Sequence, residues 1–109
     1  MTVNDFAKIL RHPAARLESE DYYVAHKTGQ TGYKAHFRLH DLWYWYSVSG
    51  TSVSVSRFEV ADAITHPDCS VDREGSYKRE KGFEATVRLN GHSYMLGHGN
   101  NRPFGKKEI

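Results

Sequence analysis

The sequence predicts an α+β fold in which an antiparallel sheet is accompanied by two short helices and an α-β-β-β unit occurs twice. The strongest observation is internal similarity between "GYKAHFRLHDLWYWYSVSG" (residues 32–50) and "GFEATVRLNGHSYMLGHGN" (residues 82–100), which align under a shift of 50. The preceding segments, 7–23 and 61–77, align under a shift of 54, with a His-Pro dipeptide at the same place in each. The matches occur in one order, which indicates a duplicated unit.

The length of 109 residues, with 39% hydrophobic residues, suits one domain over residues 1–109. The repeat units cover about residues 3–50 and 55–100. Residues 101–109 are expected to form a basic flexible tail.

Each unit is expected to begin with a helix. Asn4 or Asp5 is a suitable N-cap for the first helix, which should end near His12 because the residue before a proline disfavours helical geometry. Ser56 is the expected N-cap of the second helix, which should end near His66. Apolar residues at helical spacing predict the buried faces: Phe6, Ile9 and Leu10 in the first, and Val60, Ala63 and Ile64 in the second.

Strands should follow each helix. We expect a first strand at residues 22–28, a loop at 28–32 and a hairpin at 33–48. Asn90-Gly91 is a strong type I′ turn signal, and His40-Asp41 occupies the matching place in the first unit. Alternation along the first hairpin then predicts one core face, made by Tyr33, Ala35, Phe37, Leu39, Leu42, Tyr44, Tyr46 and Val48.

The opposite face of this hairpin is the predicted binding surface. It combines tryptophans with cations, whereas the second unit has ordinary surface residues there. Trp and Arg are frequent anchors of protein interfaces, and the same groups also stack on bases and contact phosphates. The alternative is that both tryptophans are buried. The predicted binding residues are Lys34, His36, Arg38, Trp43 and Trp45, with Lys106 and Lys107 of the tail.

Charge and composition exclude few partners. The formal net charge of +2 is too small to indicate a nucleic-acid partner by itself. A single cysteine, no basic-then-apolar leader and no apolar run of about 20 residues predict a cytoplasmic chain with no membrane partner.

We therefore expect a small non-enzymatic binding protein that occupies a protein or nucleoprotein surface. Inhibitors of the anti-defence type, encoded by phages or mobile elements, are one class of such proteins. An RNA- or DNA-binding module is the first alternative, and an exposed tryptophan pair would also suit a homodimer.

No metal or cofactor is expected. His36 and His40 share a strand face but lie about 13 Å apart at the rise of a strand, too far to hold one ion. His12 and His66 both precede a proline, which indicates a helix-stop role.

A small His-dependent ribonuclease toxin is the second alternative. The segment "NGHSYMLGHGN" places His92 and His98 near Arg88, and it resembles the histidine-bearing hairpin of HicA-like toxin ribonucleases over about a tenth of the chain. The resemblance implies acid–base cleavage of RNA. The predicted register instead turns His92 towards the core, beside Tyr94.

The order helix, three strands, helix over residues 4–66 resembles that of double-stranded RNA-binding domains. The segment "VSVSRFEVADAI" lacks the lysine cluster of that family, and "TGQTGYK" lacks its Gly-Pro-x-His loop. The resemblance therefore implies a topology and no activity.

Overall fold

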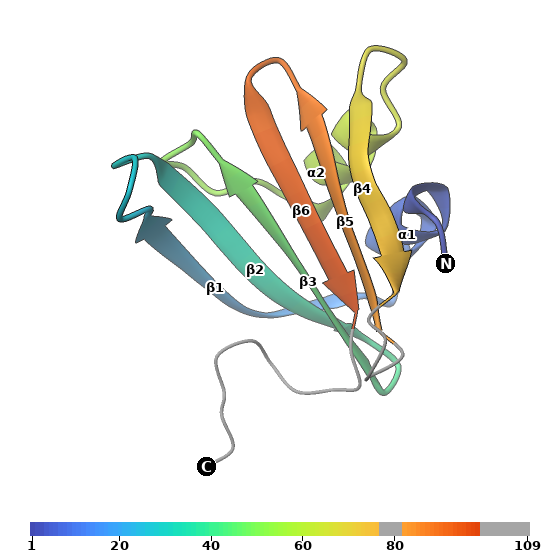
Figure 1. Ribbon diagram of the computed structural model, residues 1–109. Coiled ribbons are helices and arrows are strands. Elements are labelled where there is room, and N and C mark those ends of the chain that lie inside the picture. The colour runs from blue at the N-terminus through green and yellow to red at the C-terminus, as the bar shows by residue number, and fades with distance from the viewer. Residues whose placement is uncertain (77–81, 99–109) are drawn as a thin grey trace.

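The computed structural model describes residues 1–76 and 82–98, which form two helices and one six-stranded antiparallel sheet (Figure 1). The fold class is therefore α+β, as the sequence predicts. The elements are α1 (Val3–Leu10), β1 (Arg16–Val24), β2 (Thr31–Leu39), β3 (Leu42–Ser49), α2 (Arg57–Ile64), β4 (Ser70–Ser76), β5 (Phe83–Leu89) and β6 (His92–His98). The order α-β-β-β thus occurs twice along the chain.

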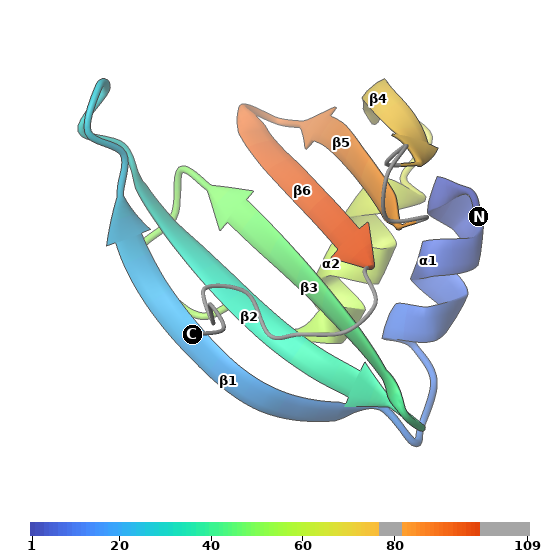
Figure 2. The same cartoon turned by 60° about the horizontal axis from the view of Figure 1, so that its bottom comes forward.

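The sheet joins the two sets of strands at its centre. Its strand order is β1-β2-β3-β6-β5-β4, so β3 pairs with β6, and β1 and β4 are the two edges. Both helices lie on the same side of the sheet, behind it in Figures 1 and 2. No helix formed by residues 1–76 or 82–98 lies on the other side.

A capping box starts α1. The Thr2 hydroxyl accepts a hydrogen bond from the Asp5 amide at 3.1 Å, and the Asp5 carboxylate accepts one from the Thr2 amide at 2.9 Å. The prediction of Asn4 or Asp5 as N-cap was wrong, because the N-cap is Thr2. Asp5 is the third helical residue, and its carboxylate bonds back to the amide of the N-cap.

The start of α2 confirms the predicted cap. Ser56 is the N-cap, and Glu59 completes the same reciprocal pair of hydrogen bonds that begins α1. Both helices end two residues before the histidine of the His-Pro dipeptide. The two rings then have the same role, since His12 Nδ1 accepts from the Ala14 amide at 3.0 Å and His66 Nδ1 from the Asp68 amide at 2.9 Å.

The two hairpins confirm the predicted register. Leu39 is opposite Leu42 and Phe37 is opposite Tyr44 in the first hairpin. In the second, Asn90 and Gly91 form the turn with φ of 52° and 83°, both in the left-handed region that a type I′ turn requires. The predicted core face of the first hairpin is buried except for Leu42, which is 47% exposed because it lies at the turn, at the end of the sheet.

β1 begins six residues before the predicted strand at 22–28 and ends at Val24, because residues 26–28 form a turn. The prediction missed its first six residues because a bulge between Leu17 and Ser19 breaks the alternation of apolar and polar residues. β4 has the same irregularity, between Val71 and Arg73. These positions are equivalent under the shift of 54.

The core lies between the helices and the sheet. Phe6 of α1 is fully buried and contacts three aromatic rings of the sheet, Phe37, Tyr44 and Phe83, at centroid distances of 6.3, 5.9 and 6.1 Å. Burying such a side chain stabilises the fold by about 1.5–3 kcal/mol. The single ring of Phe6 thus ties strands from both halves of the sheet to α1.

Polar contacts also cross between the units, and two of them involve the ends of α1. The Glu74 carboxylate of β4 accepts a hydrogen bond from the Val3 amide of α1 at 2.6 Å. The Arg57 guanidinium at the start of α2 donates to the Leu10 and His12 carbonyls at the end of α1. Each contact therefore connects residues from different halves of the chain.

Candidate functional site

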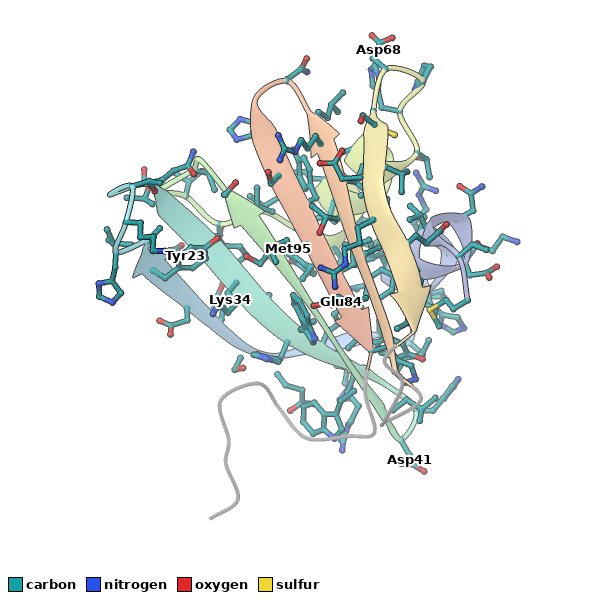
Figure 3. All side chains as sticks on the ribbon, in the orientation of Figure 1. Tyr23, Lys34, Asp41, Asp68, Glu84 and Met95 are labelled. Carbon is teal, nitrogen blue, oxygen red and sulfur yellow. The ribbon has the colours of Figure 1, made fainter. Side chains whose placement is uncertain are left out.

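The surface opposite the helices, here called the outer face, is the candidate site. The pairing register places all five predicted binding residues within 1–98, Lys34, His36, Arg38, Trp43 and Trp45, on this face. Figure 3 shows labelled side chains across the same sheet, with Tyr23 and Lys34 on the strands at one side, Glu84 at the other and Met95 between them. Lys106 and Lys107 lie outside the described residues.

Two aromatic rings lie on glycines of neighbouring strands. Trp45 of β3 is paired with Gly97 of β6, and a Cβ placed on Gly97 would be 2.2 Å from the indole. Tyr23 of β1 covers Gly32 of β2 in the same way, with the nearest ring atom at 2.1 Å from such a Cβ. Only glycine admits a ring at this distance.

The tryptophans are consequently neither fully exposed nor sealed inside. Trp43 and Trp45 are both half-buried, which lies between the two interpretations that the sequence left open. Half-buried aromatic rings on a sheet surface retain apolar area for a partner.

Two cations lie over these aromatic residues. The Arg38 guanidinium is 5.4 Å from the centre of the Trp43 ring, and Lys34 Nζ is 5.1 Å from the centre of the Tyr23 ring. Such cation–π contacts contribute about 0.5–1 kcal/mol at exposed sites. They hold the side chains in defined positions and so reduce the entropy lost when a partner binds.

His36 is buried, although it was predicted to contact a partner. Its side chain and that of Ser47 are 7% and 6% exposed, so His36 offers little surface for direct contact. His36 Nδ1 lies 3.3 Å from the Ser19 hydroxyl, and the hydroxyls of Tyr23 and Ser47 are 3.0 Å apart. Burial, and secondarily the charge of Lys34, lowers the pKa of His36 to about 4, so the ring is neutral at physiological pH.

Several charged side chains of the outer face form ion pairs with one another. Glu18 and Asp72, the extra residues of the two bulges, pair with Arg38 and Arg88. Arg73 pairs with Glu84 at 3.4 Å. Equivalent arginines in the two units thus have equivalent acidic partners. A surface with interspersed charges of both signs lacks the continuous positive stripe that is typical of nucleic-acid binding.

The three residues of the ribonuclease alternative do not converge. His92 and His98 are the two ends of β6, about 20 Å apart at the rise of a strand. Their Nδ1 atoms contact the Ser49 carbonyl at 2.9 Å and the Trp43 carbonyl at 3.1 Å. Arg88 is paired with Ser93, so its side chain projects from the face opposite to that of His92.

A groove of about 350 Å³ separates β1 from the start of α2. Its buried hydroxyls have partners within the chain: Tyr33 donates to Glu20 at 2.6 Å, and Tyr46 donates to the Val55 carbonyl at 2.6 Å. Within residues 1–76 and 82–98, no three His, Cys, Asp or Glu side chains gather in a way that would hold a metal ion.

Sequence reasoning missed the contribution of β1 to the outer face. Arg16, Ser19 and Tyr23 all lie there, opposite Arg38, His36 and Gly32. The shift of 54 aligns residues 16–22 with residues 70–76, so a strand found in either segment predicts one in the other.

Comparison of the chain with protein-family models, curated proteins and solved structures gave no match. Neither helix in the described part of the chain has the length and apolar character needed to cross a bilayer.

Proposed function

We propose that this chain is a non-catalytic binding protein that contacts a protein partner through the outer face of β1, β2 and β3. The observation that carries the proposal is the difference between the two halves of this face. Trp43 and Trp45 occupy one half, and the equivalent residues of the other half are Ser93 and Met95. Aromatic residues at positions where the repeated unit folds with Ser or Met are candidates for recognition.

The charge pattern favours a protein over a nucleic acid. Arg38, Arg73 and Arg88 each have an acidic side chain beside them, so a phosphate backbone would meet both signs of charge. A protein surface offers both signs as well, and it gains from covering half-buried rings.

We also infer that the two α-β-β-β units arose by duplication. The support is that three local features recur in both units under the shift of 54. Each unit has a capping box, and in each the histidine before the proline accepts a hydrogen bond from the amide two residues later. Each unit also has a bulge whose extra residue is an acid that pairs with an arginine. A duplicated unit keeps what packing needs, which leaves an outer face to specialise.

The test compares Trp43→Ala with Met95→Ala, a control from the other half of the same face. The purified chain is incubated with an extract of the cells in which it naturally occurs and is then crosslinked. The bound proteins are quantified by mass spectrometry. We expect one protein or complex to be enriched by the wild type and by Met95→Ala and lost with Trp43→Ala, while circular dichroism remains unchanged. Equal enrichment by both variants would contradict the proposal.

The nucleic-acid alternative is tested by titrating RNA and DNA oligonucleotides while following tryptophan fluorescence. Binding whose affinity falls steeply with salt would favour that alternative. An inhibitory role of the anti-defence type stays a prediction, which is tested by assaying the activity of the purified partner with and without the chain.

A further inference from the structure

We propose that Arg16, Arg38 and Trp43 form a receptor for a carboxylate side chain in an acidic segment of the partner protein. This inference rests on the proposed function. Arg16 and Arg38 are direct partners in the β1–β2 pairing, so their side chains leave the sheet side by side on the outer face. Like charges directly opposite each other destabilise a sheet, and such an arrangement calls for an explanation.

One acid compensates two arginines at this corner. Glu18 Oε2 lies 3.6 Å from Arg38 Nε, and the Arg38 side chain remains 43% exposed. The exposed guanidinium of Arg16 has no hydrogen bond or ion pair with any other residue that the structure describes. One positive charge is therefore left over, beside an arginine that still faces solvent.

The second unit shows that the sheet does not need this excess charge. Arg88 is equivalent to Arg38 and has its own acid, Asp72, but the residue opposite it is Ser70. Ser93 stands in the place of Trp43. The same backbone arrangement is thus made with one arginine, one acid and no aromatic ring, so Arg16 and Trp43 are additions specific to the first unit.

The geometry suits a carboxylate. The Trp43 ring supports the Arg38 guanidinium from one side at 5.4 Å, which restricts its conformations. A planar guanidinium held in place presents two parallel N–H groups to a carboxylate, and a second arginine beside it adds charge.

A protein acid fits this corner better than a nucleic-acid backbone does. Asp21 and Glu18 lie on the same stretch of β1 and confine the excess positive charge to one point. A flexible acidic segment can place one side-chain carboxylate at that point and turn its other acids towards solvent, whereas the phosphates of a nucleic acid are part of its backbone and follow one another across the surface. A single side-chain carboxylate needs only the local excess of one charge.

The experiment uses the full chain with two labelled probes, a poly-L-glutamate of about 20 residues and an oligothymidylate of similar length, and measures their fluorescence anisotropy at low salt. Arg16→Ala is compared with Arg88→Ala, which removes the arginine from the Ser70–Arg88 pair, the counterpart of the Arg16–Arg38 pair in the other half. We expect Arg16→Ala to weaken polyglutamate binding about fivefold to tenfold and Arg88→Ala to leave it within about twofold.

Several results would overturn the inference: no binding of polyglutamate, equal losses in both variants, or tighter binding of the oligonucleotide than of polyglutamate. The failure of the inference is distinguishable from that of the proposed function. If the partner from cell extract is lost with Trp43→Ala but retained with Arg16→Ala, the binding function stands and the carboxylate receptor is wrong.

Discussion

The indole of Trp45 rests on the backbone of Gly97, across the β3–β6 pair that joins the two halves of the sheet. A Cβ on Gly97 would be 2.2 Å from both Cε2 and Nε1 of the indole, so the ring faces the glycine rather than touching it with an edge. An aromatic ring over a strand glycine restores the packing that the missing side chain leaves open. The pair therefore couples a feature of the candidate site to the stability of the sheet.

Gly97→Ala should destabilise the protein by about 1–3 kcal/mol, because the added methyl group must displace the Trp45 ring from a central strand. Urea unfolding measures the loss, and near-ultraviolet circular dichroism should report the moved indole. Ser93→Ala, on the same face of β6, is the control and should change stability by less than about 0.5 kcal/mol. An unchanged unfolding midpoint for Gly97→Ala would show that the ring does not pack there.

His36 should make stability depend on pH in a defined window. Its pKa is about 4 in the folded chain against an ordinary value of 6.5, so between these values the unfolded chain binds more protons than the folded one. The free energy of unfolding should therefore fall as the pH drops from about 6.5 to about 4 and lose no more from this group below that. The shift sets an upper limit of about 3 kcal/mol.

The His36 contribution is isolated by comparing unfolding midpoints of the wild type and His36→Gln at several pH values from 7 to 4. The difference between them should shrink across the window, whereas the exposed-residue control His26→Gln should run parallel to the wild type. A constant difference between wild type and His36→Gln would mean that the ring titrates normally.

The hairpins and the second helix were predictable because each rests on a local signal. Asn90-Gly91 requires left-handed backbone, Ser56 is a strong N-cap, and the turn fixes the register of every pair that follows. The two failures have different causes. The bulge after Leu17 hid the first six residues of β1, and Thr2 was overlooked because a reciprocal cap is only visible as a pair with Asp5.

The sequence predicted which residues lie on the outer face, but not how their side chains pack there. Alternation placed Trp43, Trp45 and Arg38 together, but it does not tell that a strand glycine lets Trp45 lie flat or that His36 is buried beneath the outer face. These properties depend on the neighbours across β1 and β6, whose pairing partners a single sequence does not specify.

Tyr46→Phe should cost about 1–2 kcal/mol, because the Tyr46 hydroxyl donates to the Val55 carbonyl at 2.6 Å in a buried position. Burial raises the pKa of this phenol to about 12, so the hydroxyl keeps its proton at neutral pH. Tyr44→Phe is a matched control, since the Tyr44 hydroxyl has no hydrogen bond to another described residue. Equal effects of the two changes in urea unfolding would contradict a role for the Val55 contact.

Arg57 should contribute more to stability than Arg11 does, because its guanidinium donates hydrogen bonds to two carbonyls, of Leu10 and His12, at the end of the other helix. Hydrogen bonds from a charged donor contribute about 1.5–3 kcal/mol, so Arg57→Met should lower the free energy of unfolding by that amount. Arg11→Met is the control: Arg11 forms an exposed pair with Asp62 at 2.9 Å, and such pairs contribute about 0–1 kcal/mol. Raising the salt concentration should reduce the effect of Arg11→Met and leave most of the effect of Arg57→Met, because the carbonyl contacts are partly buried. If Arg57→Met proved no more destabilising than Arg11→Met, the connection between the helices would have to come from their apolar contacts alone.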